Sequence, residues 1–76
     1  MTVKVGDIVI YKVGENDSDI IKNNHADELP AIVVCFWDAD CVNLKVFCDG
    51  PQDAWVTSAL KGTEPSNWRP VSNELS

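Results

Sequence analysis

The chain has 76 residues, enough for one small domain, and its 12 acidic against 6 basic side chains give a net charge of −6. This charge argues against a protein that binds the phosphates of DNA or RNA, or one that docks on an anionic membrane surface. No apolar run approaches the roughly 18 residues of a membrane span, no signal peptide is expected, and a hydrophobic content of 45% is that of a folded domain.

The N-terminal part of the chain predicts a strand and then a long polar excursion. Residues 8–11 are β-branched and aromatic, which is typical of a strand. The stretch at about 14–29 is acidic and polar with one apolar pair inside it, so we expect a long loop there. Asp17 or Ser18 can cap a single helical turn over residues 19–23.

The strongest strand signal lies at residues 31–37, where every side chain is apolar. A strand that is apolar on both faces is covered on both faces. Residues 41–48 alternate between apolar and polar side chains, which predicts the second strand of a hairpin. A small barrel has one interior, so the outer side of residues 31–37 needs cover from the acidic loop or from another protein chain.

Two registers of this hairpin are open. A turn at residues 38–40 pairs Trp37 with Cys41 and places Phe36 opposite Val42. The outer set of the first strand is then Val33, Cys35 and Trp37. A four-residue turn reverses the assignment, and the outer set becomes Ile32, Val34 and Phe36.

The remaining elements are short and separated by turns. They are a strand at 54–57, a single helical turn at 58–62, a last strand at 68–71 and a polar tail at 72–76. Short strands with a turn signal every 8 to 12 residues or so are typical of small barrels and sandwiches. We therefore expect an all-β protein, a small SH3-like barrel of five to six short strands that forms a single domain over residues 1–71.

Few side chains could carry catalysis or bind a metal. Cys35, Cys41 and Cys48 are odd in number and lack the spacing of a zinc site, so we expect reduced and metal-free thiols. His25 is the only histidine, and the acidic loop lacks the spacing of an EF-hand calcium site. The sequence predicts no enzyme activity, no metal and no cofactor.

The aromatic residues are the best candidates for binding. Three tryptophans are a high content for a chain of this length, and each lies at a strand end or in a short strand. Large aromatic side chains are usually core residues, but exposed ones beside the loops of SH3-like barrels form binding grooves. Both interpretations stay open, and Trp37 is the favoured anchor because tryptophan is enriched among interface hot spots. The candidate interface residues are Trp37, Phe47, Trp55 and Trp68.

Several runs of the sequence resemble a group of small proteins encoded by tailed phages and prophages. They are residues 5–11, 30–34 and 42–47, Gly62-Thr63, and Trp68-Arg69-Pro70. The resemblance covers most of residues 3–71 and implies an SH3-like barrel. Unlike in that group, residues 64–67 stand between the Gly-Thr pair and the tryptophan strand. The group has no established activity, so the resemblance implies no catalytic residues.

Two functions are compatible with these features. The first is a non-enzymatic protein-interaction module, a phage accessory or virion-associated protein that assembles through an apolar strand face with itself or with another phage or host protein. The second is a phage inhibitor of host machinery, which binds a host protein or sequesters a small nucleotide; negative charge suits mimicry of nucleic acid. Both predict a location in the host cytoplasm, and the first adds the virion.

Overall fold

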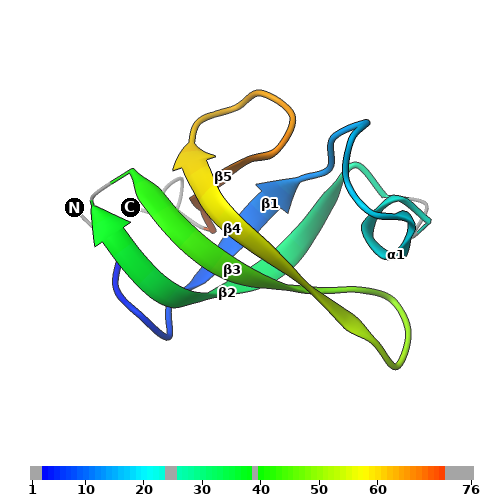
Figure 1. The fold of residues 1–76 in the computed structure, drawn as a ribbon, viewed down its shortest axis with the longest axis horizontal. Coiled ribbons are helices and arrows are strands. Elements are labelled where there is room, and N and C mark those ends of the chain that lie inside the picture. Colours follow the sequence, from blue (N-terminus) through cyan, green and yellow to red (C-terminus); the bar gives the residue numbers. More distant parts are fainter. Residues whose placement is uncertain (1–2, 24–25, 39, 72–76) are drawn as a thin grey trace.

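The computed structural model describes residues 3–23, 26–38 and 40–71 and shows a closed barrel of five strands. The elements are β1 (Ile8–Lys12), α1 (Asp19–Lys22), β2 (Glu28–Asp38), β3 (Cys41–Phe47), β4 (Asp53–Lys61) and β5 (Asn67–Pro70) (Figure 1). Paired strands are antiparallel, except that β4 and β5 pair in parallel at two positions. The expected all-β, SH3-like barrel is confirmed. The predicted tail at 72–76 lies outside the described residues.

The core fills the interior of the barrel and takes alternate residues of β1, β2 and β3, as strand geometry requires. The acidic connection between β1 and β2 contributes as well, because Ile21 of α1 is 2% exposed and belongs to this core. The short helix follows Ser18, where the sequence predicts it. The acidic loop thus adds a side chain to the interior. The buried hydrophobic residues are Val9, Tyr11, Ile21, Leu29, Ala31, Val33, Val42, Leu44, Val46, Ala59 and Trp68.

The hairpin of β2 and β3 combines features of both predicted registers. Val33 is buried opposite Leu44, as the four-residue turn predicts. A bulge at Val34 then inserts one extra residue, and such an insertion exchanges the faces of the residues that follow it. Phe36 consequently lies opposite Val42, as the shorter turn predicts, but Asp38 rather than Trp37 pairs with Cys41. The exposed apolar residues of β2 are Val34, Phe36 and Trp37.

The predicted helical turn at 58–62 is wrong, because β4 continues as a strand to Lys61. Ser58 has a φ of 57° in the left-handed region, and it lies at a register shift between β3 and β4. This irregularity lets the strand turn without ending. The extension carries β4 to β5, where Leu60 pairs with Asn67 and closes the barrel.

A buried tyrosine holds the start of the acidic loop. The Tyr11 hydroxyl donates to Asp17 Oδ1 at 2.7 Å, and the Gly14 amide donates to the other oxygen of the same carboxylate at 2.6 Å. Burial is the largest effect on the pKa of Tyr11. A hydrogen bond with Ser66 lowers this pKa and the Asp17 carboxylate raises it, and together these effects bring it to about 12. The protonated hydroxyl is therefore part of the folded structure.

We expect the free energy of unfolding to fall as the pH rises from about 10 to about 12, the ordinary and the folded-state pKa of Tyr11. In this interval the unfolded chain has lost the phenol proton while the folded chain keeps it, so rising pH favours unfolding. Tyr11 is the only tyrosine, and Tyr11→Phe should remove this part of the dependence. Urea unfolding of both proteins across the interval measures it. Equal slopes for the two proteins would contradict the assignment.

Candidate interaction surface

The solvent side of the sheet carries a row of side chains that crosses four strands. Ile8 of β1 pairs with Ile32 of β2, Ile32 with Lys45 of β3, and Lys45 with Trp55 of β4. The neighbours of these residues along their strands point into the core, so alternation turns the row outward. Figure 1 shows β2, β3 and β4 side by side, with β1 next to the first half of β2. We call this surface the outer face; it consists of Ile8, Pro30, Ile32, Lys45, Phe47 and Trp55.

Large apolar side chains on the outer face are open to solvent. Trp55 is 60% exposed, Ile8 48% and Phe47 42%. Two of the four candidate interface residues, Phe47 and Trp55, therefore lie on the same surface. Exposed large apolar side chains that gather on one surface of a small domain are typical of a protein–protein interface.

Trp37 lies at the far end of the same side and is held by a buried amide. Its indole Nε1 donates to Asn43 Oδ1 at 2.9 Å, and that oxygen also accepts from Thr57 Oγ1 at 3.0 Å and from the Ser58 amide at 2.7 Å. Asn43 is 7% exposed whereas Trp37 is 59% exposed. Sequence reasoning missed Asn43, because the alternation of residues 41–48 predicts an ordinary solvated position there.

The fourth candidate, Trp68, is not on the surface. It is 1% exposed, and its Nε1 donates to the backbone oxygens of Ala59 at 3.2 Å and Asp40 at 3.3 Å. The prediction that this residue forms part of an interface is wrong. The reason is its position in β5, the strand that pairs with β1 and β4 to close the barrel.

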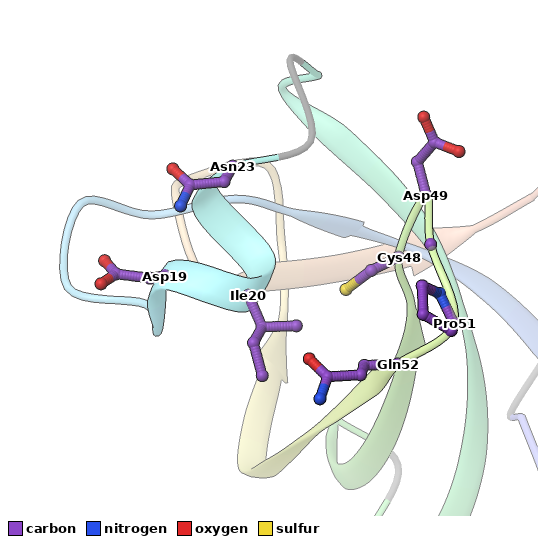
Figure 2. A pocket seen from close by; sticks show the side chains of 8 residues that line it. Asp19, Ile20, Asn23, Cys48, Asp49, Pro51 and Gln52 are labelled. Atoms are coloured by element: carbon purple, nitrogen blue, oxygen red, sulfur yellow. The ribbon is translucent and has the colours of Figure 1, made fainter.

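A cavity of about 260 Å³ separates α1 from the loop between β3 and β4. Figure 2 shows the Cys48 sulfur directed toward α1, with Ile20 and Gln52 approaching each other across the space.

All three cysteines are free and partly buried. The described residues contain no group of three His, Cys, Asp or Glu side chains that could hold a metal ion. His25 lies outside the described residues, so a Cys–His pair is not placed.

A second cavity, of about 240 Å³, lies at the β1–β5 side of the outer face. Arg69 donates to both oxygens of Glu28 there, from Nη2 at 2.9 Å and from Nε at 3.2 Å. The guanidinium holds the pKa of the Glu28 carboxyl below its usual range. Lys12 also lines this cavity and pairs across the strands with Glu28. These ionic groups form one border of the outer face.

Comparisons of this chain with protein-family models, with curated proteins and with solved structures found no match. No helix in the described part of the chain is long and apolar enough to cross a membrane. The topology defines the class of protein, a small SH3-like barrel. Its function has to be inferred from its own surface.

Proposed function

We propose that this protein is a non-enzymatic protein-interaction module that assembles through the outer face. The observation that carries the proposal is the exposure of Trp55, Ile8 and Phe47 on a sheet whose inner side already forms the core. The sequence resemblance adds a role as a phage accessory or virion-associated protein in the host cytoplasm. Its partner is a second copy of the chain or another phage or host protein.

Burial of this surface offers a substantial free energy. Complete burial of a large apolar side chain contributes about 1.5 to 3 kcal/mol, and these side chains, which are about half exposed, can gain about half of that. Tryptophan is among the residues enriched in interface hot spots. In the described part of the acidic loop, Ile21 already belongs to the core. A partner that covers Trp55 and its neighbours would bury them.

The proposal includes that the protein has no enzyme activity. The cavity beside α1 offers the Cys48 thiol together with carboxylates and amides, and its described lining contains no histidine or lysine. A cysteine nucleophile needs an adjacent base or a cationic neighbour to form the thiolate.

Site-specific photocrosslinking tests the proposal in cells that produce the full chain. A benzoyl-phenylalanine residue replaces Trp55 in one protein and Ile20 in the other; Ile20 is a matched exposed apolar residue on α1. We expect protein adducts from position 55 and few from position 20. Failure of position 55 to form any adduct would contradict the proposal.

A second candidate is an inhibitor that binds a basic host protein, and the charge distribution favours it to some degree. The loop that contains α1 carries Glu15, Asp17, Asp19 and Asp27, and such a surface attracts a basic partner. Adducts from position 20 in place of position 55 would support this function. Nucleotide sequestration has weaker support, because Glu28 already occupies the guanidinium of Arg69.

A further inference from the structure

We infer that the partner of the outer face is the outer face of a second copy of this chain, an inference that rests on the proposed function. The two copies meet about a two-fold axis, with Trp55 in the contact. Such an isologous contact is the commonest symmetry of soluble homo-oligomers, because one self-complementary surface serves both subunits.

The outer face has the anatomy of an interface between two proteins. Its apolar side chains flank Lys45, which pairs across the strands with both Ile32 and Trp55. Lys45 forms an ion pair with Asp53 at 3.5 Å, and the pair of Arg69 with Glu28 at 2.9 Å lies at the border toward β5. Aromatic side chains together with a few paired charges are common in specific interfaces.

The charges of this surface favour a second copy over a basic protein. The outer face and its borders carry three cations, Lys12, Lys45 and Arg69, and two carboxylates, Glu28 and Asp53, a local charge of +1 on a chain of −6. The other described carboxylates lie at strand ends, in α1 or in the loops. Two copies can therefore meet here without facing rows of carboxylates, which would repel. A basic protein would be drawn to the acidic ends of the barrel instead.

The available area limits the stability of such a dimer. A standard interface takes about 800 Å² from each partner, roughly a sixth of the 4933 Å² surface of this chain. The molecule measures 32 × 26 × 22 Å, so this area corresponds to one of its broad sides. The six residues of the outer face supply only part of this area, so their neighbours on the same strands have to supply the rest. We expect a reversible dimer that dissociates at micromolar concentration.

Sedimentation equilibrium of the full chain tests the inference. The wild-type protein should show a monomer–dimer equilibrium, and Trp55→Ala should weaken the dimer by about tenfold or more, as truncation of a hot-spot residue does. Phe47→Ala, a second variant on the same face, should weaken it as well. Ile20→Ala is the matched control, since Ile20 and Phe47 are equally exposed at 42%, and it should leave the dimer unchanged. Circular dichroism establishes that each variant is folded.

The two proposals fail in different ways. A wild-type protein that stays monomeric throughout the micromolar range, or an Ile20→Ala variant that weakens the dimer as much as Trp55→Ala, overturns the inference. In the photocrosslinking experiment, an adduct of twice the chain mass from position 55 supports it. Adducts from position 55 that contain only another protein overturn self-association and leave the interaction function standing. The absence of every adduct from that position overturns both.

Discussion

Replacing Trp68 with alanine is expected to remove about 3 to 5 kcal/mol of stability, the cost of truncating a buried aromatic side chain. A domain of this size has a free energy of unfolding of roughly 4 to 11 kcal/mol, at about 0.05 to 0.15 kcal/mol per residue. Trp68 is among the largest fully buried side chains and lies in the strand that closes the barrel. The variant should therefore be substantially unfolded at room temperature or melt far below the wild type, as circular dichroism with urea titration can measure.

Two control variants separate the contributions of Trp68. Trp68→Phe keeps an aromatic ring but loses the Nε1 donor to Ala59 and Asp40, which should cost about 1 to 3 kcal/mol. Trp55→Ala removes the same side chain from a position that is 60% exposed, so it should change the stability of the monomer little. Equal stability of Trp68→Ala and Trp55→Ala would show that Trp68 does not support the fold in this way.

Asn43→Ala is expected to lower the free energy of unfolding by about 2 to 3 kcal/mol, because a buried acceptor that serves three donors is lost. The Ser58 amide is held at 2.7 Å in the irregular part of β4, where Ser58 has a positive φ. Removal of its acceptor leaves this donor unpaired. Trp37 loses its anchor as well, so its indole proton should exchange faster with solvent in an NMR measurement.

Thr57→Ala is the matched control for Asn43. It removes one of the three hydrogen bonds and leaves the Ser58 and Trp37 contacts to the same oxygen in place. We expect a loss of only about 0.5 to 1.5 kcal/mol and little change in the exchange of the Trp37 indole proton. A loss from Asn43→Ala no larger than that from Thr57→Ala would mean that the shared acceptor has no special role.

The candidate surface was only partly predictable from the sequence. Phe47 and Trp55 were expected to be interface candidates, and both are exposed on one face. Trp37 is exposed too, but the amide that holds it could not be anticipated, because Asn43 looks like any outward residue of an alternating strand. Trp68 stands in an equally short strand and is buried, so strand length and position along the chain do not distinguish a surface tryptophan from a core one. The self-association and the phage origin remain predictions.

Local patterns were sufficient for the elements and the class of fold. The β-branched run of β1, the apolar run of β2 and the alternation of β3 each depend on neighbours in the chain, and the structure contains these elements. The short helix also begins after Ser18, although the Ser18 side chain makes no capping hydrogen bond. The register of β2 was decided by tertiary structure, because the irregularity at Val34 is a feature of its pairing with β3. The extension of β4 through Ser58 likewise depends on pairing with β5, a contact between distant parts of the chain that no local pattern encodes.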